Sequence, residues 1–427
     1  MSVAVFAAVL TFAFFGSPHG ETSFAVAVTW NIWWVLLPFS ALVLGRAWCS
    51  ICPISTISVT MLGFRKKPRR NERKEGLEGG PWASALVLLI LSWAMIVWRI
   101  DEMPRATGVL LLVFLIGALA AGLLLEERAW CKSICPIGTI IGLYSRLAPL
   151  QLRPSATTCA ARCERAGKCH AALSSAHCLL DGPVSALQSN RSCNLCGDCL
   201  KSCRHSSLGL RFSWPEALRA RASAVTVGEV AVLMILFALV LLDLLRMTPW
   251  YPSLMKWLVP AVPGGAYNLA LGLVILGLAA SLATLYGLVT WVCTAMAKQD
   301  LLNSLVALAS PYVALAAAVH LGSEVFHLVS HGTRPLLAMA LDLGFRVDFP
   351  AVVRGAIYMQ DSTLQAIDAT LLLIALILGG RAFWQISALA PVGKLRFAVS
   401  AGVPAALSAL IAGAAMFLFS SPMGMIH

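Results

Sequence analysis

The sequence Arg46-Ala47-Trp48-Cys49-Ser50-Ile51-Cys52-Pro53 occurs a second time, with one inserted residue, as Arg128-Ala129-Trp130-Cys131-Lys132-Ser133-Ile134-Cys135-Pro136. Each copy follows a pair of apolar stretches. The proline at its end stops any helix that includes the second cysteine. The recurrence indicates an internal duplication, in which each copy is a membrane hairpin that ends in two cysteines.

The composition supports a membrane protein. The chain has 427 residues, of which 59% are hydrophobic and 12% charged, and its mean hydropathy is +0.81. A chain this apolar is expected to cross the membrane several times. The net charge of +12 could suggest a nucleic-acid partner. Basic loops that face anionic lipid explain this charge better, so we expect membrane lipid and no nucleic acid as the partner.

Nine membrane spans are predicted. The first apolar stretch is short for a span, and a truncated or re-entrant helix is the alternative there. The nine stretches are residues 2–16, 23–45, 82–98, 106–125, 223–245, 267–293, 304–331, 364–380 and 397–420.

A basic loop sets the orientation of these spans. It contains Arg65, Lys66, Lys67, Arg69, Arg70, Arg73 and Lys74. The positive-inside rule places this loop in the cytoplasm, and the polar segment that follows the second hairpin lies on the same side. We therefore expect a multi-pass protein of the bacterial inner (cytoplasmic) membrane. Its three parts are the duplicated hairpins (1–150), a cytoplasmic segment (151–222) and a C-terminal membrane region of about five helices (223–427).

The cytoplasmic segment ends in Cys193-x2-Cys196-x2-Cys199-x3-Cys203. This is the spacing with which bacterial ferredoxins hold a [4Fe–4S] cluster. Three thiolates on one tight loop reach three irons, and the fourth reaches another cubane. A structural zinc site is the alternative, but zinc usually takes two CxxC pairs separated by a longer loop.

Four more cysteines precede this motif, as Cys159-x3-Cys163-x5-Cys169-x8-Cys178. In two-cluster ferredoxins the fourth cysteine of each motif binds the cluster of the other motif. Cys178 is then expected to join Cys193, Cys196 and Cys199, while Cys203 joins Cys159, Cys163 and Cys169. This arrangement predicts two [4Fe–4S] clusters; a single cluster with spare thiols is the alternative.

The two Cys–Pro pairs, Cys49/Cys52 and Cys131/Cys135, end equivalent hairpins. If the hairpins pack with pseudo-two-fold symmetry, their four thiols converge at the membrane surface. Such thiols could hold a further cluster, bind a soft metal such as Cu(I), or cycle as dithiols. Four unrelated buried thiols are the remaining alternative, but the repeated flanking residues argue against it.

The C-terminal region carries one polar stripe. His320, Glu324, His327 and His331 fall on one face of a predicted helix. Ionisable groups inside a membrane usually face partners or cavities, so a quinone-binding pocket or a proton path is expected here. A haem held by two histidines of one helix is geometrically awkward. A polar seam satisfied by water is the alternative without function.

Two hairpins with Cys–Pro ends, followed by a ferredoxin-type cysteine segment, resemble the membrane polyferredoxins of the NapH and NosR type. The resemblance covers roughly residues 20–215. In that family both pairs are usually Cys-x3-Cys-Pro; Cys131/Cys135 match this spacing, and Cys49/Cys52 are one residue short. The resemblance implies electron transfer between the quinone pool and another redox protein, or maturation of a metal centre.

The sequence thus predicts an all-α polytopic membrane protein with a cytoplasmic ferredoxin-like insert that holds two cubane clusters. The expected function is electron transfer through iron–sulfur clusters between quinone and an unidentified redox partner protein, with quinol oxidation as the enzymatic reaction to test. A factor that reduces or delivers copper during metal-centre assembly is one alternative. A membrane regulator that senses redox state is another.

Overall fold

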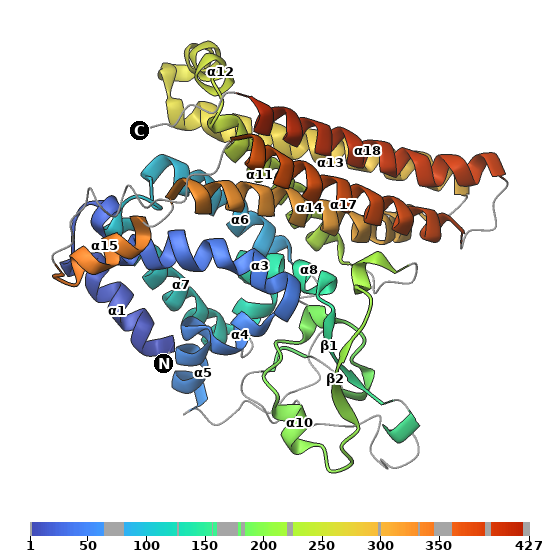
Figure 1. Cartoon of the computed structure of the whole chain (residues 1–427), viewed down its shortest axis with the longest axis horizontal. Helices are drawn as coiled ribbons and strands as arrows, with labels where there is room; N and C mark the ends of the chain where they lie inside the picture. The colour runs from blue at the N-terminus through green and yellow to red at the C-terminus, as the bar shows by residue number, and fades with distance from the viewer. Residues whose placement is uncertain are drawn as a thin grey trace.

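The computed structural model of the chain describes residues 2–63, 81–125, 128–155, 157–159, 178–180, 184–219, 225–297, 300–331, 334–345, 361–388 and 394–421. The predicted basic loop of residues 65–74 lies outside these ranges, as do Cys163 and Cys169. The described part is mainly helical, with a small insert that projects from one side of the helices (Figure 1).

Both predicted hairpins are present. The first consists of α1 (Ser2–Phe15), a second helix built from α2 (Phe24–Val26), the π-helical η2 (Ala27–Trp34) and α3 (Val35–Leu44), and then α4 (Ala47–Ile51) and α5 (Pro53–Gly63). The second consists of α6 (Trp82–Trp98), α7 (Pro104–Leu124), the π-helical η3 (Trp130–Ile134) and α8 (Pro136–Tyr144). In both hairpins the helix after the cysteines begins at the proline, whose missing N–H costs nothing in a first turn.

The hairpins exchange these last helices. Helix α5 of the first hairpin packs on α7 of the second, and α8 of the second packs on α3 of the first. At the first contact, a Cβ added to Gly122 would clash with the Leu62 side chain, so the absence of a side chain at Gly122 permits the approach. This reciprocal packing is the pseudo-symmetry that the duplicated sequence predicts.

The C-terminal region surrounds two central helices. Its helices are α11 (Val227–Arg246), α12 (Trp250–Leu258), α13 (Tyr267–Ala297), α14 (Leu301–His331), α15 (Arg334–Asp342), α17 (Asp361–Ala388) and α18 (Lys394–Ser420). The apolar windows of α14 and α11 are 83% and 72% buried, whereas those of the other spans are 28–39% buried. Polar groups on α11 and α14 therefore face protein more than lipid.

Seven described helices are long and apolar enough to cross a membrane. The two other predicted spans coincide with α1 and α6, which are helical but have only 14 and 17 residues. At about 1.5 Å per residue they measure roughly 21 and 26 Å, less than the ~30 Å hydrocarbon core of a bilayer. The structure thus supports a polytopic helical protein, and the count of nine spans stays a prediction.

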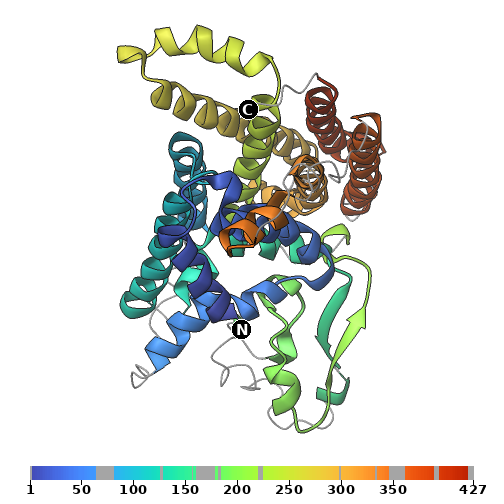
Figure 2. The ribbon, with the colours of Figure 1, turned by 60° about the vertical axis from the view of Figure 1, so that its left-hand side comes forward.

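The insert contains the only strands in the described ranges. Strands β1 (Leu150–Pro154) and β2 (Leu208–Phe212) pair antiparallel, with Leu152 opposite Leu210, and the short helix α10 (Asp198–Ser202) lies between them in sequence. These strands lie within the insert, and the remaining described elements are helical, in agreement with the prediction of an all-α polytopic protein. Figure 2 shows the strands of the insert below α17 and α18. The insert touches α17, where the guanidinium of Arg381 lies 5.8 Å from the centre of the Trp214 ring.

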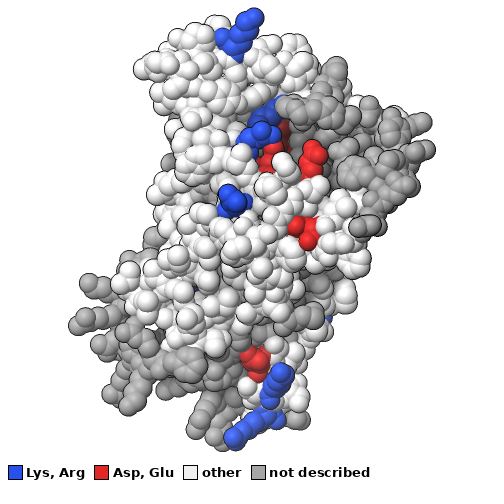
Figure 3. Space-filling view, turned by 90° about the vertical axis from the view of Figure 1, so that its left-hand side faces the viewer, with Lys and Arg blue, Asp and Glu red and all other residues white. Residues whose placement is uncertain are grey.

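The opposite end of the bundle carries α15. There the carboxylate of Asp342 accepts hydrogen bonds from the backbone N–H groups of Ser17 and Phe24, at 2.7 and 2.8 Å. Figure 3 views this end; among the described residues it shows few charged side chains, gathered in small groups between uncharged ones. The contact of Asp342 places residues 17–24 and α15 at the same end, as the predicted topology requires.

Candidate metal centres

The extra residue of the second Cys–Pro motif is absorbed as a π-turn. Around Cys49 the chain forms the short α-helix α4, and the Cys49 N–H bonds three residues back, to the carbonyl of the N-cap residue Arg46, at 2.9 Å. In the second copy the Cys135 N–H reaches back five residues to the Trp130 carbonyl at 2.8 Å. A π-turn accommodates one residue more than an α-turn, so both copies reach their second cysteine in the same way.

The second cysteine of each pair precedes a helix with the same backbone conformation. Cys52 has φ −60° and ψ 122°, and Cys135 has φ −67° and ψ 113°. The Cys135 sulfur accepts a hydrogen bond from the Gly138 N–H at 3.3 Å, and Cys52 accepts one from the backbone of Ser55. Both sulfurs thus face the positive end of a helix, which favours a thiolate and hence metal ligation.

The exchanged helices bring the four thiols close enough to affect one another. Burial, with smaller contributions from the neighbouring Cys49 and Cys131, raises the pKa of Cys52 to about 12. Burial also raises the pKa of Cys131 and that of Cys135; Cys49 adds to the first shift, and the three other thiols add to the second. Without a cation, Cys52, Cys131 and Cys135 therefore stay protonated near neutral pH. A metal centre bound here would therefore displace protons.

Arg46 links the Cys–Pro thiols to the insert. Its guanidinium donates to the carbonyl of Cys131 at 3.2 Å and to the carbonyl of Arg191 at 2.7 Å. Arg46 is buried, and a Cβ added to Gly138 or Gly142 would lie 3.3 Å from its nitrogens. Two glycines on one face of α8 therefore make room for this side chain. Burial raises the pKa of Cys193, and the positive charge of Arg46 partly offsets this shift. Arg46 has the same effect on Cys131, so its charge acts on both cysteine groups.

The repeat does not reproduce this arginine contact. Ser55 and Val59 of α5 stand where α8 has Gly138 and Gly142. Ser55 instead donates a hydrogen bond to the Cys131 sulfur, and Arg128 lines a cavity on that face of α5. The two halves of the centre thus share a backbone conformation but differ in the side chains that surround the cysteines.

In the insert, Cys178 joins Cys193, Cys196 and Cys199. Cys178 forms a side-chain hydrogen bond with Cys196, which raises the pKa of Cys178, and Cys199 interacts with Cys193 and Cys196. These are the four thiols that the sequence predicts for one cluster.

The loop that carries these thiols has two left-handed residues. Leu195 has φ +54° and Gly197 has φ +80°. The backbone N–H of Leu195 donates to the Cys193 sulfur.

The described part of the second predicted ligand set is also gathered. The sulfurs of Cys159 and Cys203 lie 3.3 and 3.2 Å from one hydroxyl, that of Ser207. The β-hairpin brings the two cysteines together, because the Ser155 N–H bonds to the Ser207 carbonyl where β1 ends and β2 begins, and each cysteine lies four residues from one of these serines. Cys163 and Cys169 lie outside the described residues, so their part in this set stays a prediction.

The donor sets fit iron–sulfur clusters in their chemistry. All donors are cysteine thiols, which suit iron–sulfur clusters, and backbone N–H groups point at several of the sulfurs. No three His, Cys, Asp or Glu side chains of the described ranges stand at the spacing of ligands on one metal ion. A cubane spreads its four ligands over four irons, so its ligands stand farther apart than those of a single ion.

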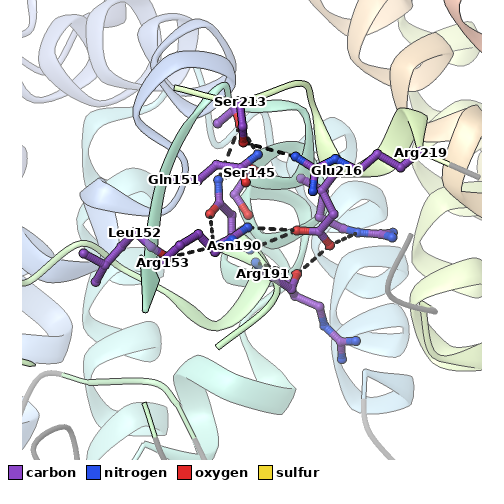
Figure 4. Close-up of polar contacts among 12 residues, drawn as sticks. Ser145, Gln151, Leu152, Arg153, Asn190, Arg191, Ser213, Glu216 and Arg219 are labelled. Atoms are coloured by element: carbon purple, nitrogen blue, oxygen red, sulfur yellow. Dashed lines mark hydrogen bonds and ion pairs between the residues drawn. The ribbon is translucent and has the colours of Figure 1, made fainter. Parts of the chain in front are cut away.

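A buried polar network seats the insert on the bundle (Figure 4). Glu216 forms an ion pair with Arg146 at 3.2 Å and accepts from the Asn190 N–H at 3.1 Å. Arg146, which is fully buried, also donates to Ser310 of α14 at 2.8 Å. The Asn190 amide donates to three carbonyls, the nearest being that of Leu150 at 3.1 Å. These contacts fix the positions of the insert segments around Asn190 and Glu216 relative to α14.

The polar stripe of α14 is divided between two partners. His320 contacts Glu324, with Nε2 3.2 Å from Oε1, and its Nδ1 lies 3.0 Å from the Tyr144 hydroxyl. His327 instead pairs with Asp243 of α11. His331 ends the helix, and its side chain lies outside the described part.

Three residues in these arrangements escaped the sequence analysis as functional candidates: Arg46, Tyr144 and Asp243. Asp243 has a signal, since it is the one carboxylate within the apolar run 230–245 and such residues are functional candidates by default. Arg46 belongs to the recurring motif, but its contact with Arg191 depends on the folded insert. Nothing in the sequence marks Tyr144.

Comparison with known proteins agrees with the duplicated site. A model of a 4Fe-4S binding domain matches residues 26–71 and 107–154, the two stretches that contain the Cys–Pro pairs. The matched stretches end before Cys159. The similarity to a 4Fe-4S binding domain therefore concerns the two repeats and does not extend to the cysteines of the insert.

Two curated relatives were found. The methylamine utilization ferredoxin-type protein MauN of Paracoccus denitrificans is 30% identical over 177 residues, which cover 38% of this chain and 58% of the relative. The protein named "Putative electron transport protein YccM", of Escherichia coli, is 29% identical over 137 residues, which cover 32% of this chain and 34% of the relative. The chain thus spans less than two thirds of the length of either relative. No solved structure matches the chain.

Proposed function

We propose that this protein carries electrons between a quinone in the membrane and a redox partner that docks at the insert. The observation that carries the proposal is the Arg46 contact, which joins the Cys–Pro thiols to the cysteine group of the insert. The two repeats match a 4Fe-4S binding domain, and both relatives bear names that describe ferredoxin-type or electron transport proteins. A protein that carries electrons over a distance needs redox centres close to one another, as these two cysteine groups are.

We infer three ligand sets, of which the third includes two cysteines outside the described residues. Cys49, Cys52, Cys131 and Cys135 form the first, Cys178, Cys193, Cys196 and Cys199 the second, and Cys159, Cys163, Cys169 and Cys203 the third. Clusters bound at these sets would supply one-electron carriers. The protein supplies the positive charge of Arg46 between the first two sets and the N–H groups at their sulfurs, both of which stabilise added negative charge.

The quinone end of the path is the cavity beside His320. Apolar side chains of η2, α3 and α8 form its walls, and the Tyr144 hydroxyl and the His320 ring supply its polar groups. Ile137, two residues after Cys135, is one of the lining residues. The cavity measures about 20 Å³, room for one water molecule, so a quinone ring enters only when the side chains of its walls move apart.

The orientation follows from charge. The basic loop of residues 65–74 places the insert on the cytoplasmic side of a bacterial inner membrane, where its redox partner is then a soluble protein or domain. The order of hairpins and cysteine segment favours the NapH type among membrane polyferredoxins.

Anaerobic mixing of the purified, cluster-loaded protein with decylubiquinol tests the proposal. We expect rapid bleaching of the iron–sulfur absorbance, a matching electron paramagnetic resonance signal, and about twelve irons per chain, four for each cluster. His320→Gln and Tyr144→Phe should slow the bleaching while iron content stays unchanged. Stoichiometric Cu(I) binding without any reaction with quinol would instead favour the copper-assembly function.

A further inference from the structure

Helices α8, α14 and α11 carry a row of ionisable side chains through an otherwise apolar bundle. Its members are Tyr144, His320, Glu324, His327 and Asp243. The row begins at the end of α8, the helix that starts next to Cys135, and it follows α14 toward the end of the bundle that carries α15 (Figure 1). It therefore leads away from the cysteines.

The first half of the row is deeply buried. The Tyr144 hydroxyl meets His320 Nδ1 at 3.0 Å, and His320 Nε2 meets Glu324 Oε1 at 3.2 Å. The side chains of His320 and Glu324 are 11% and 5% exposed. The second carboxylate oxygen, Oε2, is buried and has no hydrogen-bond partner among the described residues. Buried polar atoms are nearly always satisfied, so this oxygen points to a bound water or a transient partner.

The second half opens to the surroundings. His327 Nε2 lies 3.2 Å from Asp243 Oδ2, and the Ser323 hydroxyl donates to the same oxygen at 2.8 Å. The side chains of His327 and Asp243 are 31% and 35% exposed, several times more than those of His320 and Glu324. Arg246 and Asp101, near the helix ends, are within electrostatic range of Asp243.

The two halves adjoin on α14. Glu324 and His327 are three residues apart, which makes them neighbours on a helix surface, and their charges interact. An imidazole accepts a proton on one nitrogen and releases one from the other, and a carboxyl group does the same with its two oxygens. Each member of the row can therefore pass a proton on.

Other charged groups near α14 lie off the row. Asp368 of α17 lies beside Gly322, where an added Cβ would be 2.7 Å from its Oδ1, and Gly322 is turned away from the face of His320 and Glu324. Arg146 contacts Ser310, nearly three helical turns before His320. The described parts of α3, α13 and α18 that pack on α14 bring no Asp, Glu, Lys, Arg or His side chain to the row.

We propose that Tyr144, His320, Glu324, His327 and Asp243 form a proton path from the cavity beside His320 to the end of the bundle opposite the cysteines. This rests on the proposed function. Oxidation of one quinol to quinone releases two electrons, which leave toward the cysteine groups, and two protons. The Tyr144 hydroxyl takes each proton and gives its own to His320 Nδ1, and His320 Nε2 then delivers its proton to Glu324 Oε1. Rotation of the Glu324 carboxyl group presents that proton to the Asp243–His327 pair, which releases it to water. A rotation of the His320 ring and a return rotation of the carboxylate restore the starting state before the next proton.

The test uses the full-length, cluster-loaded protein in lipid vesicles, with decylubiquinol as donor and a pH dye on each side of the membrane in turn. Glu324→Gln and Asp243→Asn should each slow quinol-driven cluster reduction about tenfold or more, and proton release at the end opposite the insert should slow equally. Reduction by dithionite and iron content should not change. Asp368→Asn, which alters a buried carboxylate off the row, is the matched control and should stay within about twofold.

The outcomes separate the two proposals. Quinol reduction in the wild type with unchanged rates in both row variants would overturn the path and leave the proposed function standing. Proton release on the insert side would also overturn it. A wild-type protein that quinol does not reduce, although dithionite does, would refute the proposed function and the path together.

Discussion

At the residue scale, a few side chains hold parts of the chain that are far apart in sequence. Arg46 reaches Cys131 and Arg191, 85 and 145 residues away. Glu216 pairs with Arg146 across 70 residues. A buried charge is costly unless it is paired or hydrogen-bonded, so these contacts strongly favour one arrangement of their neighbours. They define where the insert sits.

Arg46→Lys should loosen the insert. A lysine keeps the charge but cannot hold two carbonyls in the fixed geometry of a guanidinium. Loss of one charge-assisted hydrogen bond costs about 2 kcal/mol, which corresponds to roughly 30-fold faster cleavage by trypsin at Lys201 or Arg204 if the insert must open first. Arg219→Lys, which changes contacts only to Ser213 and Trp214 within the insert, is the control. Equal cleavage of both variants would contradict the seating role of Arg46.

Glu216→Gln should destabilise the protein far more than the loss of a surface pair. Removal of one member of a buried ion pair leaves the other charge without compensation, at a cost of about 3–5 kcal/mol. The pair of Arg99 and Glu102 is more than half exposed, so Glu102→Gln should cost less than about 1 kcal/mol. The midpoints of thermal denaturation in detergent compare the two variants, and similar midpoints would show that the Glu216 network does not hold the insert.

At the element scale, the π-turn η3 reconciles two cysteine spacings. A helix turns about 100° per residue, so one unmatched residue would aim Cys131 away from the other thiols. The turn takes up that residue between Cys131 and Cys135, and α8 starts as α5 does. Unequal spacing is thus compatible with one shared centre.

Deletion of Ser133 should therefore leave the Cys–Pro centre intact, because it makes the second motif equal in spacing to the first. The shortened turn becomes α-helical, as it is around Cys49, and Cys131 keeps its direction toward the other thiols. We expect the deletion variant to retain the same iron content per chain as the wild type and as Ser133→Ala, which keeps the length. Loss of about four irons per chain in the deletion variant alone would mean that the centre requires the π-turn itself.

At the scale of the whole molecule, the exchanged helices turn a duplication into one centre. Because α5 packs on α7 and α8 packs on α3, neither hairpin can present its cysteines without the other. The four thiols, contributed equally by both halves, then influence one another.

Cys52→Ser and Cys135→Ser should consequently cause similar losses, and the double variant should be little worse than either single one. Residues that act as a unit show this strong non-additivity, whereas independent sites add in free energy. The measurements are quinol-driven electron flow and iron content of the purified variants. Additive losses would mean two separate dithiols.

The sequence by itself determined the membrane class, the duplication and the position of the cysteine segment. Hydropathy, a repeated motif and thiol spacing are local properties of the sequence, so they can be recognised without knowledge of the fold. It also predicted Cys178 as the companion of Cys193, Cys196 and Cys199, through the interlocked pattern of two-cluster ferredoxins. In the structure Cys178 interacts with Cys193 and Cys196, and the shared cluster stays a prediction.

Only the tertiary structure decided how these parts meet. The contact of Arg46 with the insert, the pairing of His327 with Asp243 and the place of Tyr144 beside His320 each join residues more than 80 positions apart. No period or spacing encodes such contacts, because they arise from the packing of whole helices. The burial of α11 and α14 at the centre likewise depends on all their neighbours, and it turns a polar stripe on one helix into a row that crosses three.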